Sequence, residues 1–163
     1  MAAADLLNKA GHQVTLFEKD EKAGGLLRYG IPDFKLNKTT IDRRLDLMIE
    51  EGLIVRTGIN IGKDIYGKEL LEQFDAICIA VGSTLPRDLN VEGRELTGIH
   101  YAMDFLTLQN RANSGQLTAN NNPLNAEWKK VLIIGGGDTG SDCVGTSIRQ
   151  KAVNVTQIEI LPK

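Results

Sequence analysis

A glycine-rich stretch near the end of the sequence carries the clearest chemical signal. Residues 131–140 read VLIIGGGDTG, so an apolar run ends in a G-x-G-x-x-G pattern. This spacing suits a strand-to-helix turn that binds a dinucleotide pyrophosphate at the positive end of the helix. Gly135 would permit the tight bend, Gly137 the approach of the pyrophosphate, and Gly140 the close packing of helix on strand. The turn comprises Gly135, Gly136, Gly137, Asp138, Thr139 and Gly140. The alternative is a glycine turn that serves packing only.

Two other stretches could also face a nucleotide. Glu18 ends a short apolar run that follows a helix, where an acid accepts hydrogen bonds from ribose hydroxyls. A solvated acid at a strand end is the alternative. Ala80, Val81 and Gly82 end a second apolar run and would let a flat cofactor approach the backbone. A simple turn at the end of a strand explains them equally well.

The elements needed to position these residues alternate between helix and strand. Helical spacing, glycine stops and apolar runs predict helices at 2–10, 37–52, 67–74, 100–113 and 138–152. Strands are predicted at 12–19, 53–62, 75–83, 131–134 and 154–163, with 75–83 as a buried parallel strand. Residues 22–32 are predicted to form a loop, and the polar, Asn-rich residues 114–127 a linker.

Composition narrows the class of protein. The chain has 163 residues, 42% hydrophobic and 25% charged, as is typical of a soluble globular protein. A net charge of −2 gives no reason to expect nucleic acid or an anionic membrane as partner. No basic segment precedes an apolar stretch at the start, so we expect a cytoplasmic protein without a signal peptide. Cys78 and Cys143 lie far apart, so we expect two reduced, buried thiols and no iron–sulfur or zinc site built from this chain.

Four stretches together carry a family resemblance over nearly the whole chain. They are VTLFEKDEKAGGLLRYGIPDFKL, IDRRLDLMIEEG, DAICIAVGSTLPRDLNVEGRELTGIHYAMDFL and VLIIGGGDTGSDCVGTSIRQ. The chain thereby resembles the FAD- and NAD(P)-dependent small (beta) subunit of glutamate synthase, within the pyridine nucleotide oxidoreductases. The flavoprotein parts of dihydropyrimidine dehydrogenase and adrenodoxin reductase are more distant in resemblance.

The resemblance implies an α/β fold of the three-layer type, with incomplete Rossmann-like domains and parallel sheets. Residues 1–113 would be a partial FAD-binding domain lacking its first strand and glycine turn. Residues 114–130 would be a linker, and residues 131–163 the first βαβ unit of an NAD(P)-binding domain. The chain would then be a central fragment. We expect FAD binding by this chain alone to be weak or absent, and self-association through exposed sheet edges.

The resemblance also implies cofactor contacts. Glu18 would hold the FAD ribose, and the flavin dinucleotide would run past further residues, namely Gly25, Leu26, Lys35, Ile61, Ala80, Val81 and Gly82. The glycine turn would contact the NAD(P)H pyrophosphate through Gly136, Gly137, Asp138 and Thr139. No metal ligand and no catalytic acid, base or nucleophile is assigned to this chain. The NAD or NADP preference stays open: Glu159 is the candidate acid, and Ile160, Leu161 and Lys163 occupy the place where NADP enzymes carry basic residues.

For the intact protein, the resemblance implies hydride transfer from NAD(P)H to FAD. Electrons would pass through iron–sulfur centres, with no ligands in this chain, to the large subunit that forms glutamate. Two alternatives remain open. One is a related NAD(P)H-dependent flavoprotein oxidoreductase, and the other is a truncated, non-catalytic module that binds a nucleotide or a partner.

Overall fold

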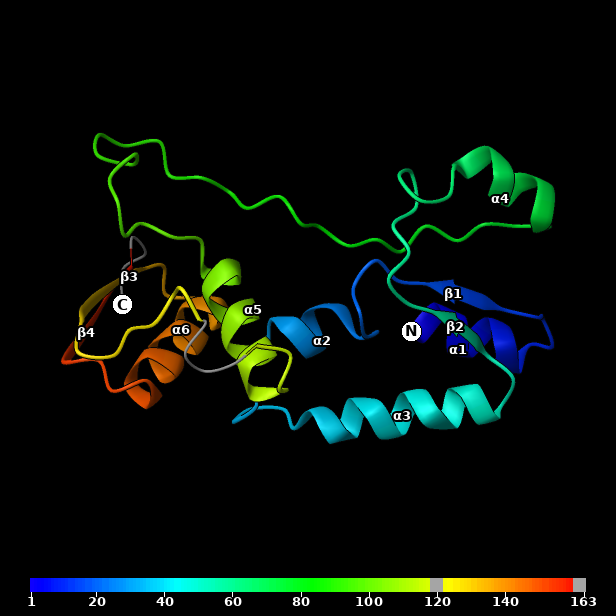
Figure 1. The fold of residues 1–163 in the computed structure, drawn as a ribbon, viewed down its shortest axis with the longest axis horizontal. Helices are drawn as coiled ribbons and strands as arrows, with labels where there is room; N and C mark the ends of the chain where they lie inside the picture. Colours follow the sequence, from blue (N-terminus) through cyan, green and yellow to red (C-terminus); the bar gives the residue numbers. More distant parts are fainter. Residues whose placement is uncertain (118–121, 160–163) are drawn as a thin grey trace. The chain divides into compact units, whose positions relative to one another are not determined.

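The computed structural model describes residues 1–117 and 122–159. The chain forms two compact units, each built from segments that are separate in the sequence. The first unit comprises Met1–Gly25 and Asn37–Gly82, and the second comprises Leu26–Leu36 and Ser83–Lys163. Helices and parallel strands occur in both units (Figure 1), which confirms the predicted α/β class.

The first unit packs two helices on a pair of parallel strands. Its elements are α1 (Ala2–Lys9), β1 (Thr15–Phe17), α3 (Lys38–Glu50), β2 (Ile54–Arg56) and α4 (Gly67–Gln73). Strands β1 and β2 pair in parallel, with Leu16 opposite Val55. The core consists of Ala4 from α1, Met48 from α3 and Leu53, with Val14 and Leu16 packed against them. Apolar side chains at helical spacing therefore attach both helices to the strand pair.

Polar contacts fix the ends of these helices. The Asn37 side chain caps α3 by accepting the Thr39 N–H at 3.0 Å, and Gly52 follows the helix with a φ of 103°. The Arg44 guanidinium contacts the Asp5 carboxylate at 2.6 Å and so joins α3 to α1. A hydrogen bond from Lys9, together with the charge of Arg44, holds the pKa of Asp5 below its ordinary value. This exposed pair orients the helices more than it stabilises them.

The second unit contains a βαβ arrangement. Its elements are α2 (Gly25–Tyr29), of which Gly25 belongs to the first unit, α5 (Ala102–Asn113), β3 (Lys130–Ile134), α6 (Asp138–Arg149) and β4 (Asn154–Ile158). Strands β3 and β4 pair in parallel, with Ile133 opposite Gln157. Leu106, Ile133 and Cys143 form the core on one side of this pair. Alternation along the strands leaves the opposite face with exposed apolar side chains, namely Leu132, Ile134 and Ile158.

The structure differs from the sequence-based prediction at two places. Residues 75–83 form no strand and are exposed, and the whole segment between α4 and α5 contains neither helix nor strand (Figure 1). A buried parallel strand needs partners at its edges and layers on both faces, and within the described residues this run has no strand partner. Cys78 is consequently exposed rather than buried. The predicted loop 22–32 also contains the short helix α2.

Other predicted elements are present with shorter bounds. Helices α1, α3, α4, α5 and α6 fall inside the ranges predicted for them, and β1, β2 and β4 are shorter than the predicted strands. Part of the predicted linker (118–121) and of the last strand (160–163) lies outside the described residues. The predicted domain limits at 113 and 131 stay a prediction. Within the described part of the chain, no helix is long and apolar enough to span a membrane.

The packing of α3 gives a matched pair of substitutions. We expect Met48→Ala to lower the free energy of unfolding of the first unit by about 2–5 kcal/mol, because Met48 is 2% exposed in its core. The neighbouring Leu47→Ala removes a side chain that is 42% exposed and should cost less than about 1 kcal/mol. Urea denaturation followed by circular dichroism measures both. An equal loss of unfolding free energy in both variants would show that α3 does not pack on the core through the face that carries Met48.

Candidate functional site

The glycine turn lies between β3 and α6, as the sequence predicts. The N–H of Gly135 donates to the Ile158 carbonyl at 2.9 Å, which continues the β3–β4 ladder into the turn. Gly135 has a φ of 121°, a conformation that side chains other than glycine rarely adopt. Gly137 is the N-cap residue of α6, with a φ of −74°, and Asp138 begins the helix. The turn therefore needs glycine at its first position for backbone reasons alone.

The third glycine of the pattern is required by close packing. A Cβ at Gly140 would lie 2.2 Å from the Gly135 carbonyl oxygen and 2.9 Å from Nε2 of Gln157. Gln157 on β4 donates to that same carbonyl at 2.7 Å. Helix α6 can approach the end of β3 only because Gly140 has no side chain. Gln157 was not identified from the sequence. Its place on the strand that follows α6, two residues before the candidate acid Glu159, could have indicated it.

The start of α6 offers backbone donors to an anion. No side chain of the described residues caps this helix, because its N-cap residue is Gly137. The first N–H bonded inside the helix at this end is that of Ser141, which donates to the Gly137 carbonyl at 3.0 Å. Asp138 and Thr139 in the first turn are exposed. The backbone therefore presents the arrangement that binds phosphate at helix N-termini.

The candidate acid for nicotinamide selection lies against the turn. A Cβ at Gly136 would clash with the carboxyl group of Glu159, so this side chain covers the second glycine. Its position after β4 is that of the acid that contacts the ribose in dinucleotide-binding folds. Ile160, Leu161 and Lys163 lie outside the described residues. The preference for NAD or NADP therefore stays open.

Glu18 lies at the carboxyl end of β1 in the first unit. Its N–H donates to the Arg56 carbonyl at 2.9 Å, and its carbonyl accepts from Ile59 at 3.0 Å. Its half-buried carboxylate accepts the Asp20 N–H at 3.1 Å. Ile61, two residues beyond Ile59, forms an isolated bridge with Ile65 and is 40% exposed. Through these two backbone hydrogen bonds of Glu18, the pairing of β1 with β2 continues to Ile59, two residues before Ile61.

The remaining predicted cofactor residues are divided between the two units. Gly25 has a φ of 50° at the start of α2, and Leu26 in the same helix is 62% exposed. The Lys35 ammonium forms an ion pair with the Asp142 carboxylate on α6. Ala80, Val81 and Gly82 lie exposed in the segment without regular structure. The structure brings together the residues of the glycine turn, and the FAD contacts expected of the other residues stay a prediction.

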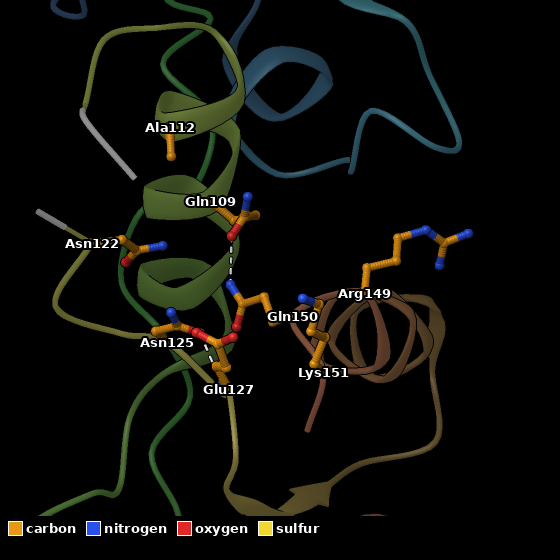
Figure 2. A pocket seen from close by; sticks show the side chains of 8 residues that line it. All are labelled: Gln109, Ala112, Asn122, Asn125, Glu127, Arg149, Gln150 and Lys151. Atoms are coloured by element: carbon orange, nitrogen blue, oxygen red, sulfur yellow. Dashed lines mark hydrogen bonds between the residues drawn. The ribbon is translucent and has the colours of Figure 1, made fainter. Parts of the chain in front are cut away.

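A separate pocket of about 190 Å³ lies in the second unit and is shown in Figure 2. Polar or charged residues predominate among those that line it, which are Gln109, Ala112, Asn122, Asn125, Glu127, Arg149, Gln150 and Lys151. Gln150 uses its amide there to donate to Gln109 and to accept the Ala126 N–H at 2.8 Å. Arg149 and Gln150 end α6, while the glycine turn begins it, so pocket and turn lie at opposite ends of a 12-residue helix. The pocket is also smaller than ordinary cofactor sites.

The chemistry of the described side chains is limited. Among residues 1–117 and 122–159, no group of three or more His, Cys, Asp or Glu side chains could hold a metal ion. Burial raises the pKa of the Cys143 thiol to about 11, and the charge of Asp142 adds to the rise. Cys143 is therefore protonated at neutral pH and belongs to the core rather than to a reactive site.

The fold is one that occurs in solved oxidoreductases. The structure superposes on FprA from Mycobacterium tuberculosis (His57Gln mutant) with a TM-score of 0.77 at 21% identity, covering 96% of this chain and 40% of that one. A second structure, Mycobacterium tuberculosis FprA in complex with NADPH, superposes with a TM-score of 0.76. At this identity the likeness establishes the fold alone.

The sequence profile of the pyridine nucleotide-disulphide oxidoreductase family matches residues 1–163. The chain belongs to this family. It is 51% identical over its whole length to the glutamate synthase (NADPH) small chain of Mycobacterium tuberculosis and 48% identical to that of Bacillus subtilis. The NADH glutamate synthase of Schizosaccharomyces pombe is 46% identical over 99% of the chain. These matches confirm the predicted resemblance to glutamate synthase small subunits.

The chain spans about a third of the length of the two bacterial relatives, 34% and 33%, and 8% of the fission-yeast protein.

The turn gives a test of close packing. We expect Gly140→Ala to lower the free energy of unfolding of the second unit by about 1–3 kcal/mol, because its Cβ would overlap the Gly135 carbonyl. Gly137→Ala is the control, since nothing lies within 4 Å of its Cβ and its φ is negative. Thermal unfolding by circular dichroism compares the two. An unchanged midpoint for Gly140→Ala would contradict the close approach of α6 to β3.

The two cysteines should differ in reactivity. At pH 8 we expect iodoacetamide to modify exposed Cys78 and to leave buried Cys143 unmodified, with both modified in denaturant.

The raised pKa of Cys143 also predicts a pH dependence of stability. Because this pKa rises from 9.0 to about 11 on folding, the thiol keeps its proton in the native state at a pH where the unfolded state loses it. The free energy of unfolding should therefore fall as pH rises between these values, and Cys143→Ala should flatten that slope. Denaturation at several pH values measures this slope, and mass spectrometry measures the labelling of each thiol. Equal labelling of the two thiols would contradict the burial.

Proposed function

We propose that this chain carries the cofactor-binding part of the electron-input subunit of a glutamate synthase. The NAD(P)H site would be the turn Gly135–Gly140, and Glu18 would belong to the FAD site. One observation supports the proposal most: the third glycine of the turn cannot bear a side chain, and no side-chain hydrogen bond from the described residues caps the helix start beside it, which leaves its backbone donors available. The names of the bacterial relatives agree with it.

The residues of the turn fit a dinucleotide pyrophosphate. Gly137 has open space where a Cβ would stand, so phosphate oxygens could approach the backbone there. The N–H groups at the start of α6 would donate to these oxygens, and the helix dipole favours their negative charge. Gln157 would keep the turn in shape through its bond to Gly135. This part of the chain would therefore bind and orient the dinucleotide.

The residues near β1 fit part of an FAD site. Glu18 directly follows β1. Its carboxylate now accepts a hydrogen bond from the Asp20 N–H and could accept hydrogen bonds from ribose hydroxyls instead. Leu26, Ile61 and the run Ala80–Gly82 would line the path of the flavin dinucleotide, with Gly25 at the bend before α2. When bound, the two cofactors supply the hydride chemistry, with the reduced nicotinamide as donor and the flavin as acceptor.

No side chain of this stretch is assigned a proton-transfer role. Asp138 and Thr139 are exposed in the first turn of α6, where they would orient the turn. Asp142 is paired with Lys35. The role of the protein here would be binding, orientation and electrostatics.

The wider assembly is part of the same proposal. Electrons would reach the large subunit, which forms glutamate, through iron–sulfur centres whose ligands come from other sequence, because this chain has two cysteines. Residues 1–113 would be part of the FAD-binding domain, 114–130 a linker, and 131–163 the first βαβ unit of the NAD(P)-binding domain. The site of action would be the cytoplasm.

Self-association of the isolated chain is also proposed. Leu132, Ile134 and Ile158 lie on the exposed face of the β3–β4 pair and are 58%, 57% and 47% exposed. Apolar side chains gathered on an open sheet favour association with a second surface. Light scattering that finds a clean monomer at micromolar concentration would contradict this part.

The defining experiment mixes the full-length protein that carries this sequence with NADPH or NADH under anaerobic conditions. Loss of the oxidised-flavin absorbance is expected with at least one of them. Addition of the large subunit, 2-oxoglutarate and glutamine should then yield glutamate. Flavin reduction without glutamate formation would favour a related flavoprotein oxidoreductase, and binding without flavin reduction would favour a non-catalytic module.

Gly137→Ala tests the dinucleotide site without disturbing the fold. We expect NAD(P)H binding by the full-length protein to weaken at least about tenfold, because the new Cβ would occupy the approach of the pyrophosphate. The unfolding midpoint should stay within about 1 °C of the unaltered protein. Gly67→Ala is the matched control, since Gly67 also stands at a helix start with open space around its Cβ. Fluorescence titration measures the affinities, and equal affinity in all three proteins would rule out this site.

A further inference from the structure

Residues Leu26–Leu36, here named the docking segment, are fixed to α5 by a buried amide. Asn110 on α5 is 2% exposed, and its Nδ2 donates to the Tyr29 carbonyl at 2.9 Å and to the Ile31 carbonyl at 3.2 Å. The guanidinium carbon of Arg111 lies 5.2 Å from the centre of the Tyr29 ring. One side-chain amide thus satisfies two backbone carbonyls of the docking segment. The middle of the segment is therefore held in one place.

The far end of the docking segment contacts α6 through Phe34. A Cβ at Gly145, inside α6, would lie 2.7 Å from Cζ of the Phe34 ring. The guanidinium of Arg149 lies over the same ring at 3.7 Å, and its Nη1 donates to the Gly145 carbonyl at 3.0 Å. In Figure 2 the Arg149 side chain extends away from Gln109 and Asn125. Glycine is a poor residue for a helix interior, and here it leaves the space that the ring occupies.

The next residue of the segment contacts α6 through charge. The Lys35 ammonium forms an ion pair with Asp142, which is 7% exposed. A buried carboxylate without such a partner would be costly. Asp142 lies one turn after Asp138, so its charge is close to the helix start that would receive a pyrophosphate. Without Lys35, that charge would oppose the binding of another anion there.

The three contacted residues of α6 lie on one face. Asp142, Gly145 and Arg149 are spaced three and four residues apart, which brings them into line on a helix. We infer that Phe34 and Lys35 are positioning residues that hold α6 by this face, a role that rests on the proposed dinucleotide site at the glycine turn. For Lys35, this role replaces the flavin contact that the family resemblance implies. They thereby set the placement of bound NAD(P)H relative to the docking segment, which also carries Leu26 from the proposed flavin path.

The first test uses the full-length protein with its cofactors. We expect Lys35→Met to slow flavin reduction by NAD(P)H about tenfold to a hundredfold and to weaken NAD(P)H binding, with FAD content unchanged. Adding Asp142→Asn to this variant removes the uncompensated charge and should recover most of the affinity. Lys9→Met is the matched control, because Lys9 also pairs with an acid, Asp5, at 3.1 Å. Stopped-flow absorbance gives the rates and the affinities separately.

The outcomes separate this inference from the proposed function. Rates and affinities of Lys35→Met within twofold of the unaltered protein would overturn the positioning role alone. Loss of FAD from Lys35→Met would also overturn it, since Lys35 would then act on the flavin itself. If the unaltered protein shows no flavin reduction with NADPH or NADH, the proposed function is wrong and the positioning role falls with it.

A second test measures the thermal stability that depends on the Phe34 contact. It needs no enzymatic activity, so it applies even if the Lys35 variant folds poorly. Gly145→Ala should lower the unfolding midpoint by several degrees while Phe34 is present, because its Cβ would strike the ring. In the Phe34→Ala background the same substitution should raise the midpoint, since alanine favours a helix. The same sign in both backgrounds would show that Phe34 does not dock on α6.

Discussion

The close approach of α6 to the end of β3 is the constraint on which the candidate site depends. Gly140 lies so near the Gly135 carbonyl that a single added carbon would overlap it. Because the two elements touch at this point, the start of the helix stands directly beside the turn, and Gln157 ties the same carbonyl to β4. A phosphate-binding arrangement follows from backbone geometry, with little dependence on side-chain chemistry.

The same helix is held from a second direction. The glycine turn fixes where α6 begins, whereas the docking segment contacts its middle and its last turn through Phe34 and Lys35. Charge and shape both contribute to this contact, because Lys35 forms an ion pair with Asp142 and Gly145 leaves room for the Phe34 ring. Under the proposed function, a helix held at both places would place a bound dinucleotide reproducibly, as hydride transfer requires.

Each strand pair in the structure is small. A parallel pair needs covering layers and further strands for independent stability, and each of these pairs receives helices on its packed side. Because the other face of the β3–β4 pair carries no helix among the described residues, its apolar side chains are exposed. Apolar side chains of the run 75–83, which forms no strand, are exposed as well. The two bacterial glutamate synthase relatives are about three times as long as this chain.

The sequence by itself determined the glycine turn, the family, and the helices and strands other than α2 and the predicted strand 75–83. These features depend on local spacing: the glycines must stand at fixed offsets, and apolar residues repeat at helical intervals along α3 and α6. The sequence could not determine that Lys35 pairs with Asp142, that Asn110 binds the Tyr29 carbonyl, or that residues 75–83 form no strand. Those outcomes depend on which distant segments meet, and only the tertiary structure decides that, because the energy of a contact between residues 35 and 142 leaves no local pattern in either stretch.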